Sequence, residues 1–252
     1  MQHYFVDPSS IQHEYIQITG NDAKHIARVM RMGPGEKIVC KDNQGRAFVT
    51  EIESVEEKSV HVKIISEWTE GAELPVNIIA AQALIKGEKM DTVVQKATEL
   101  GAAAIYFYEG EHSVVKWDAN KRQKKIDRLN RIAKEAAEQS ERMYIPEIVY
   151  FSSAREVIEH TASVGSRIVL SEAEARAELP AKLPEVFSRC PETLLAFIGP
   201  EGGFSRNELD LFEEQHIPAT SLGKRIVRSE TASLLLLGAV TYYYEIQEGN
   251  IQ

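Results

Sequence analysis

The sequence predicts an α/β protein in two parts, a small β-barrel over residues 1–72 and a larger α/β domain over residues 73–252. Two patterns indicate this fold class. Short runs that alternate apolar and polar residues, as half-buried strands do, dominate the first part. In the second part, wholly apolar runs alternate with segments of helical periodicity, which is typical of a parallel sheet covered by helices. Residues 70–75, with Gly and Pro among them, are the expected linker.

Composition sets the first limits on function. A chain of 252 residues can bury a core without a disulfide or a structural metal. Its hydrophobic content of 43% and charged content of 27% are those of a globular protein and argue against disorder. The net charge of -9 excludes a basic surface overall, but it is compatible with local basic patches. Cys40 and Cys190 lie far apart in sequence and are expected to be reduced thiols.

No metal site is predicted, because the sequence has no CxxC or HExxH motif and no close cluster of His and Cys. The first eight residues have neither the basic start nor the apolar segment of a signal peptide. The longest uncharged apolar stretch, residues 231–244, is shorter than a membrane helix and is expected to be a buried helix. We therefore expect a soluble, cytoplasmic protein that does not contact a membrane.

The N-terminal part reads as short strands joined by tight turns. Residues 37–41 and 47–52 flank the turn signal Asp42-Asn43-Gln44-Gly45, and residues 60–65 follow the period-two pattern of a strand. One helix interrupts them, beginning near residue 21 and ending at the Gly-Pro-Gly of residues 33–35.

This helix has two expected faces. At the angle of an ideal α-helix, Ile26, Val29 and Met30 fall on one side. The opposite side carries basic residues, namely Lys24, His25, Arg28 and Arg31. That basic side is either an ordinary solvated surface or a stripe that grips phosphates.

The second part is predicted to contain buried strands at residues 76–81, 102–107, 166–170 and 193–198. Helices fill the intervals between them. One ends before Gly101, a long one is capped by Asp118, and another follows a capping box at residues 153–156. The last helix has four consecutive leucines, so we expect it to be buried on all sides.

Chemistry is expected where the strand at 193–198 ends. It runs into Gly199-Pro200-Glu201-Gly202-Gly203-Phe204, and a capping box at residues 205–208 then opens a helix. Ligands of open α/β sheets bind at such strand ends, and glycines leave backbone N–H groups accessible. The loop is either this kind of site or only a tight turn. Its spacing is not the GxGxxG of dinucleotide sites, and the sequence contains no P-loop motif.

A second glycine-bearing loop, residues 221–232, leads into the last helix. Two such loops at successive strand ends would face the same rim of the sheet. The first loop brings Glu201 to that rim and the second brings Arg228.

Together these loops resemble the signature of the ribosomal RNA small subunit methyltransferase E family, within the SPOUT superfamily. The matching residues are Ile198-Gly199-Pro200-Glu201-Gly202-Gly203-Phe204 and Leu222-Gly223-x-Arg225-Ile226-x-Arg228-x-Glu230-Thr231-Ala232. Three further stretches agree, namely His25-x-x-x-Val29-x-Arg31, residues 95–101 and Glu138-Gln139-Ser140-x-Arg142. His112 departs from the arginine expected in many members, which leaves the role of that position open.

The resemblance implies a fold and an activity. The N-terminal part would be a PUA-like barrel that binds RNA, and the C-terminal part a SPOUT methyltransferase domain with a deep trefoil knot. The protein would act as a homodimer that uses S-adenosylmethionine to methylate N3 of one uridine in 16S rRNA, either free or in the small ribosomal subunit. The alternatives are a non-catalytic RNA-binding or ribosome-assembly protein that keeps the fold and, less favoured, a Rossmann-type dehydrogenase.

Catalytic residues follow from this implied reaction. Loss of the N3 proton leaves negative charge on the uracil ring, which a cation would stabilise. Arg228 is the predicted cation, and its alternative role is a salt bridge to Glu230 or Glu201. The predicted proton acceptors are Glu138 and Glu201, because a general base must lie within hydrogen-bond reach of the proton.

The loops that match the family's knot predict the cofactor site, largely through their backbone. The predicted residues are Leu170, Ser171, Ile198, Gly199, Pro200, Glu201, Gly202, Gly203, Leu222, Gly223, Ile226, Val227, Arg228 and Thr231. Thr231 and Ala232 either close the pocket or pack in the core at the start of the last helix.

RNA contacts require cations. Residues 116–142 contain nine basic and five acidic residues, a local balance of +4, which marks either a solvated helix face or an RNA-facing one. The predicted RNA-binding residues are Lys24, Arg28, Arg31, Lys116 and Arg142. Tyr242, Tyr243 and Tyr244, at the end of the last helix, have a composition favoured at interfaces and point to a dimer contact.

Overall fold

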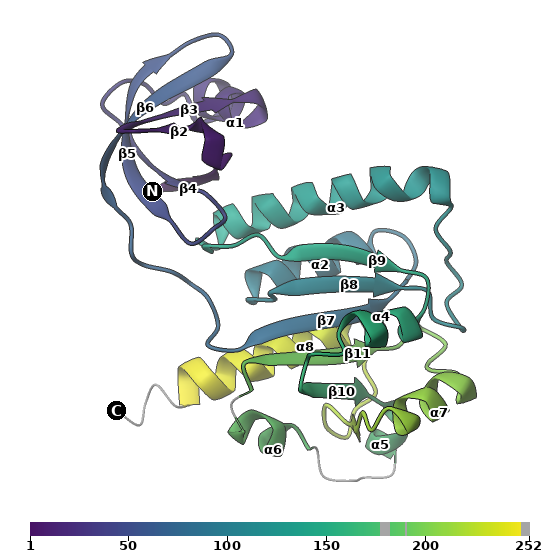
Figure 1. Cartoon of the computed structure of the whole chain (residues 1–252). Coiled ribbons are helices and arrows are strands. Elements are labelled where there is room, and N and C mark those ends of the chain that lie inside the picture. Colours follow the sequence, from purple (N-terminus) through teal and green to yellow (C-terminus); the bar gives the residue numbers. More distant parts are fainter. Residues whose placement is uncertain (177–181, 190, 248–252) are drawn as a thin grey trace. The chain divides into compact units, whose positions relative to one another are not determined.

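The computed structural model of the chain describes residues 1–176, 182–189 and 191–247. It divides into two compact units (Figure 1). The first contains Met1–Glu73 and Ala137–Ile145, and the second contains Leu74–Ala136 and Pro146–Gln252. Cys40 is a buried free thiol, whereas Cys190 lies outside the described residues.

The first unit is a six-stranded curled sheet. Its strand order is β1 (Gln2–Phe5), β4 (Lys37–Lys41), β5 (Ala47–Val55), β6 (Ser59–Glu67), β3 (Tyr15–Thr19) and β2 (Ile11–Gln12). Only β1 and β4 pair in parallel, and the predicted hairpin forms β4 and β5. The core is apolar, with Ile16, Ile38 and Val62 at most 1% exposed. A short 3-10 helix, η1 (Pro8–Ser10), joins β1 to β2.

The helix of this unit corrects one prediction. It is a five-residue α-helix, α1 (Gly20–Lys24), that continues as a π-helix, η2 (His25–Met30). Ile26 is buried as expected, but Val29 is 66% exposed and Met30 is 38% exposed. The predicted apolar face is therefore wrong for these two residues. A π-helix closes its hydrogen bonds over five residues, so side chains three and four positions apart no longer align as they do in an α-helix.

The segment 137–145 packs against the sheet of the first unit, although it follows the sheet's own sequence by some 70 residues. The Phe5 N–H donates to Oε1 of Glu138 at 2.9 Å. The Lys41 ammonium donates to the carbonyl of Arg142 at 2.7 Å, and the Ile145 N–H donates to Oδ1 of Asn43 at 2.7 Å. These contacts join residues about 100 positions or more apart, for which the sequence pattern has no local signal.

The second unit is built on a wholly parallel sheet. Its strand order is β12 (Ala219–Thr220), β10 (Ser166–Leu170), β11 (Thr193–Ile198), β7 (Asn77–Ala83), β8 (Ala104–Tyr108) and β9 (Glu147–Phe151). Because the strands are parallel, the carboxyl ends of all six lie at one edge. The strands expected at 166–170 and 193–198 form with these bounds.

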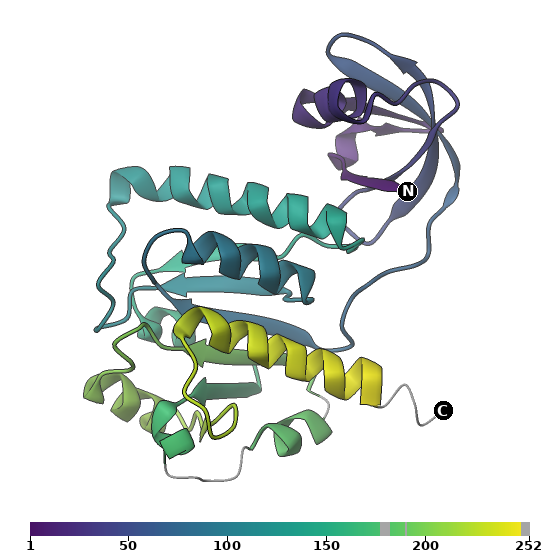
Figure 2. The same ribbon diagram turned by 180° about the vertical axis from the view of Figure 1, so that it is seen from behind.

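Helices cover both faces of this sheet (Figures 1 and 2). On one face, α4 (Ala154–His160) and α7 (Arg206–Glu214) pack into an aromatic core that includes Tyr106, Phe151 and Phe197. On the other face, α2 (Lys89–Glu99) lies beside α8 (Ser229–Thr241), and α3 (Ala119–Gln139) is the long helix next to them. The short helices α5 (Glu172–Arg176) and α6 (Leu183–Ser188) follow β10.

The predicted caps form at the helix starts, except that the box at residues 153–156 is incomplete: Ser153 caps α4, but the Glu156 side chain accepts from the Ser152 N–H. Oδ1 of Asp118 accepts from the N–H of Asn120 at the start of α3. Ser205 and Glu208 form a complete capping box on α7. These signals are local, which is why the sequence sufficed to place them.

The prediction that the last helix is buried on all sides is wrong for this chain. Leu236 and Leu237 are fully buried, but Leu235 is 39% exposed. The π-helical continuation η3 (Tyr242–Gln247) exposes Tyr242 and Ile246 by more than half. Only one face of α8 packs on α2, β7 and β11. Among the described residues, no helix is long and apolar enough to cross a membrane.

Candidate functional site

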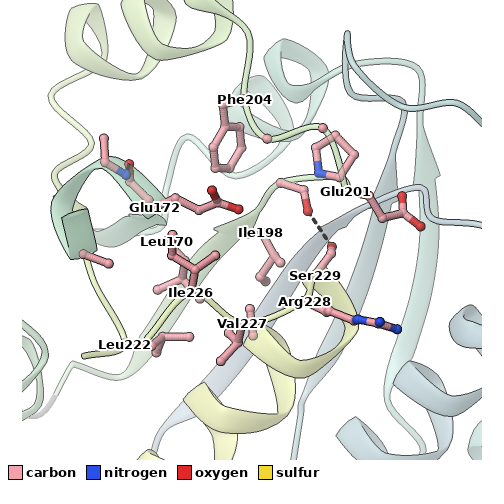
Figure 3. Close-up of a pocket in the computed structure, with 18 of the residues that line it drawn as sticks. Leu170, Glu172, Ile198, Glu201, Phe204, Leu222, Ile226, Val227, Arg228 and Ser229 are labelled. Atoms are coloured by element: carbon pink, nitrogen blue, oxygen red, sulfur yellow. Dashed lines mark hydrogen bonds between the residues drawn. The ribbon is translucent and has the colours of Figure 1, made fainter. Parts of the chain in front are cut away.

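A pocket of about 650 Å³ opens at the carboxyl edge of the parallel sheet (Figure 3). The segments that follow β10, β11 and β12 form most of its wall, and the start of α2 adds Lys89. The lining residues are Lys89, Leu170, Ser171, Glu172, Ala173, Ala175, Ile198, Gly199, Pro200, Glu201, Gly202, Gly203, Phe204, Leu209, Leu222, Arg225, Ile226, Val227, Arg228, Ser229 and Ala232. The two glycine loops thus meet at one site.

The structure brings twelve of the fourteen predicted cofactor residues to this wall. These twelve are Leu170, Ser171, Ile198, Gly199, Pro200, Glu201, Gly202, Gly203, Leu222, Ile226, Val227 and Arg228. Gly223 and Thr231 do not line the pocket. Gly223 has a φ of +106° in the turn before α8, and Thr231 is exposed on the first turn of that helix. Ala232 lines the pocket and is also buried, so its two proposed roles coincide.

Sequence reasoning missed several lining residues. They are Lys89, Glu172, Ala173, Ala175, Phe204, Leu209 and Ser229. Lys89 had a detectable signal, because Lys86-Gly87-Glu88-Lys89 is a third glycine-bearing loop between a buried strand and a helix. Gly87 has a φ of +65°, which suits glycine in such a turn.

The first glycine loop is closely packed. Gly203 has a φ of +71°, in the left-handed region that favours glycine. A Cβ atom on Gly202 would lie 3.0 Å from Cβ of His112, and one on Gly199 would lie 3.2 Å from the ring of Phe204. His112 also has Nδ1 3.3 Å from the carbonyl of Gly202, so in this chain it packs against the loop.

Buried hydrogen bonds hold the floor of the pocket in place. The Ser229 hydroxyl donates to the carbonyl of Gly199, as the dashed line in Figure 3 shows, and accepts from Nε2 of Gln82 at 2.8 Å. Tyr108 donates its hydroxyl to the carbonyl of Ile198 at 3.1 Å. Gln82 and Tyr108 are fully buried in β7 and β8, so both loops are anchored to the central strands.

The two sides of the pocket differ in chemistry. Figure 3 shows Leu170, Leu222, Ile226 and Val227 on one side, with the carboxylate of Glu172 beside them, whereas Glu201 and Arg228 extend toward the other. A mainly apolar side that carries a few polar groups suits a ligand with a planar, apolar part and polar edges.

On the charged side, Lys89 joins two carboxylates. Its Nζ lies 3.4 Å from Oε1 of Glu201 and 3.2 Å from Oε1 of Glu230. Partial burial raises the pKa of Glu201, but hydrogen bonds from its own N–H, the Lys86 N–H and Lys89 outweigh burial and hold this pKa below its usual value. The contacts raise the pKa of Lys89, chiefly through the hydrogen bond to Glu230. The Glu201 carboxylate is therefore ionised at neutral pH.

Arg228 is the N-cap residue of α8, and its side chain is exposed. Within the described part of the chain, its guanidinium makes no ion pair or hydrogen bond. The alternative role predicted for Arg228, a salt bridge to Glu230 or Glu201, is therefore not realised, because Lys89 pairs with both carboxylates.

Glu138, the other predicted proton acceptor, does not line the pocket. Its carboxylate belongs to the first unit and accepts the Phe5 N–H there. This contact gives Glu138 a structural task in the curled sheet.

The predicted RNA-binding residues fall into two groups. Lys24, Arg28, Arg31 and Lys116 are exposed. Arg142, in contrast, is 2% exposed, and its guanidinium pairs with the carboxylate of Glu73 at 2.6 Å. A guanidinium held in this way is poorly placed to contact a phosphate, so the structure favours a structural role for Arg142 over the predicted RNA contact.

The basic helix α3 also divides its cations. Arg122 lies 3.9 Å from the ring centre of Tyr150, Lys125 lies 5.1 Å from that of Trp117, and Arg128 pairs with Asp91. These three hold the helix on its own unit. Three other cations of α3 are exposed and add positive charge to the surface of this helix, namely Lys121, Lys124 and Arg131.

Comparison with known proteins decides the family. A model of the RNA methyltransferase domain matches residues 72–241, and a model of the RNA methyltransferase PUA domain matches residues 18–65. The ribosomal RNA small subunit methyltransferase E of Bacillus subtilis is 36% identical over 99% of this chain and 100% of its own length. This chain belongs to the ribosomal RNA small subunit methyltransferase E family.

Two solved structures of methyltransferases are similar to nearly the whole chain. The enzyme of Neisseria gonorrhoeae, crystallised with S-adenosylmethionine, is 28% identical over 97% of this chain and 98% of its own, with a TM-score of 0.86. A Legionella pneumophila structure with the same bound cofactor is 30% identical over 96% and 97%, with a TM-score of 0.82. The predicted fold class, a PUA-like part followed by a SPOUT-type α/β domain, is confirmed. The trefoil knot stays a prediction.

Proposed function

We propose that this methyltransferase E chain transfers the methyl group of S-adenosylmethionine to N3 of a specific uridine in 16S rRNA. Its substrate is the rRNA or the small ribosomal subunit, in the cytoplasm, and it acts as a homodimer. The pocket at the carboxyl edge of the sheet carries the proposal, because the family's glycine loops meet there around a cavity with an apolar and a charged side. A non-catalytic assembly protein has no need of such a cavity.

The residues of the pocket fit the proposed donor. An apolar wall for a planar adenine is offered by Leu170, Leu222 and Val227. The backbone of residues 198–203 lines the same pocket and can hydrogen-bond to the polar edges of the adenine ring. The charged side suits the zwitterionic methionyl end. When bound, S-adenosylmethionine supplies an electrophilic methyl group on a sulfonium.

The remaining chemistry falls to this chain's own side chains. Arg228 would stabilise the negative charge that develops on the uracil ring as the N3 proton leaves. Of the two predicted proton acceptors, Glu201 lies at the charged side of the pocket and Glu138 does not. Holding the base in line with the methyl carbon is the larger task, because positioning supplies much of the rate in a displacement reaction.

Surface features support the proposed partners. Exposed cations on α1, η2 and α3 offer sequence-independent contacts to phosphates in an otherwise acidic chain. An exposed apolar strip runs along α8 and η3 and is formed by Leu235, Tyr242 and Ile246. A second copy of this chain would cover this strip.

Methyl mapping tests the substrate assignment directly. We expect rRNA from cells that lack this protein to lose one N3-methyluridine of the small subunit, and a plasmid copy to restore it. Mass spectrometry of nuclease fragments reads out the modification. Full retention of that methyl group in the deletion strain would overturn the proposed substrate.

The donor site is tested by Gly202→Val. The Cβ atom of the new valine would crowd the side chain of His112 and displace the loop. We expect affinity for S-adenosylmethionine to fall roughly tenfold to a hundredfold, the range for overpacking a close contact. Calorimetry measures the change. Gly165→Val is the matched control, since a Cβ atom there meets nothing within 4 Å. Equal affinities for the two variants would argue against donor binding at this loop.

A further inference from the structure

Lys89 connects three segments that are far apart in sequence. It stands on the first turn of α2, whereas Glu201 belongs to the glycine loop after β11 and Glu230 to the first turn of α8. The side chains of Lys89, Glu201 and Glu230 are 34%, 31% and 18% exposed, so the cluster lies at the mouth of the pocket, not in the core.

The position of Lys89 is well defined. Its neighbour Met90 is buried, and Val93 and Val94 anchor the same helix in the core. The Lys86 N–H adds a contact of 3.4 Å to Oε1 of Glu201, so the loop before α2 and the first residue of α2 both contact this carboxylate. Lys89 therefore reaches both carboxylates from a rigid base.

Arg228 is a second cation on this side of the pocket. It lies two residues before Glu230, and Figure 3 shows its side chain extending toward the same side as Glu201. Either carboxylate would be a natural partner for an exposed guanidinium. Yet both contact Lys89, and Arg228 pairs with neither among the described residues.

We propose that Lys89 is a positioning residue, which holds Glu201 and Glu230 and thereby leaves the Arg228 guanidinium available to the base being methylated. The inference rests on the proposed function and deepens it. Without Lys89, Glu201 and Glu230 would lose the cation that contacts both of them in the structure. The guanidinium would turn to them and be withdrawn from the substrate.

The test begins with Lys89→Met in the full-length protein. We expect single-turnover methyl transfer to small-subunit rRNA to slow roughly tenfold to a hundredfold, as for a displaced catalytic group. The dissociation constant for S-adenosylmethionine is measured beside the rate, because Lys89 lines the same pocket, and we expect the rate to fall by a larger factor than the affinity. Lys96→Met is the matched control, since Lys96 lies on the same helix and also pairs with a carboxylate, that of Glu99.

A second substitution separates this role from a merely structural one. Adding Glu230→Gln to Lys89→Met removes one of the two carboxylates that compete for Arg228. We expect the double variant to transfer methyl groups several-fold faster than Lys89→Met alone. If Lys89 contributed only to folding, adding Glu230→Gln would not restore the rate of methyl transfer: its effect would add to that of Lys89→Met or slow the reaction further.

Three results would overturn the inference while leaving the proposed function in place. These are Lys89→Met equal to Lys96→Met in rate, no recovery in the double variant, and a loss confined to donor affinity. A wild-type protein that neither binds the donor nor transfers a methyl group would overturn the proposed function, and the inference with it.

Discussion

Replacing Arg228 by alanine is expected to slow methyl transfer by roughly 100-fold to 1,000-fold, the usual cost of removing one donor to a developing anion. The guanidinium is exposed at the charged side of the pocket and pairs with no described residue, so its removal leaves no buried charge behind. Its backbone, which helps line the pocket and starts α8, is retained. Single-turnover assays on small-subunit rRNA, with donor affinity from calorimetry, measure the two effects separately.

Two further variants sharpen this result. Arg228→Lys keeps the charge but loses the planar fork, and an intermediate rate would show that geometry matters as well as charge. Arg206→Ala removes an exposed arginine that pairs only locally, with Asp210 on α7, and should transfer at the wild-type rate. Full turnover by Arg228→Ala would refute the role proposed for this residue.

Replacing Arg142 by methionine is expected to lower the free energy of unfolding by about 3 kcal/mol, the low end for breaking a buried ion pair. The Arg142 side chain is 2% exposed and pairs with the Glu73 carboxylate. That carboxylate is itself partly exposed, so water solvates it in part when the arginine is removed. The Met143 N–H continues to donate to Oε1 of Glu73 at 2.8 Å, which limits the damage. Urea unfolding followed by circular dichroism measures the change.

Arg31 is the matched comparison for Arg142, because both are predicted RNA contacts. Arg31 is exposed, so Arg31→Ala should change stability by no more than about 0.5 kcal/mol. It should, however, weaken the salt dependence of RNA binding: the slope of the logarithm of the binding constant against the logarithm of the salt concentration should fall in magnitude by about one. If Arg142→Met changed the salt slope and left stability intact, Arg142 would be an RNA contact after all.

Local signals predicted much of the fold and of the pocket. The caps at Asp118 and Ser205 depend on residues within one turn, and the strands at 166–170 and 193–198 depend on runs of apolar side chains. Both glycine loops lie at the ends of parallel strands, so the topology alone carries them to one edge. The twelve predicted residues that line the pocket follow from this.

Other features depended on partners that a local pattern does not reveal. Val29 and Met30 are exposed because the helix changes to π geometry after Lys24. Arg142 looked like a surface cation until Glu73, 69 residues earlier, was found to hold it. Leu235 is exposed because only one face of α8 finds a partner in this chain.

The sequence by itself determined the parallel sheet, the glycine loops and the resemblance that led to the family, whereas the placement of residues 137–145 in the first unit came only from the fold. It could do so because strand periodicity, capping and turn residues act over a few positions. The tertiary structure decided which charges meet. Lys89 lies between Glu201 and Glu230, more than 110 residues away in sequence, and leaves Arg228 exposed. Ion pairing depends on distance in space and not along the chain, so only the folded sheet could show which arginine is buried and which is available.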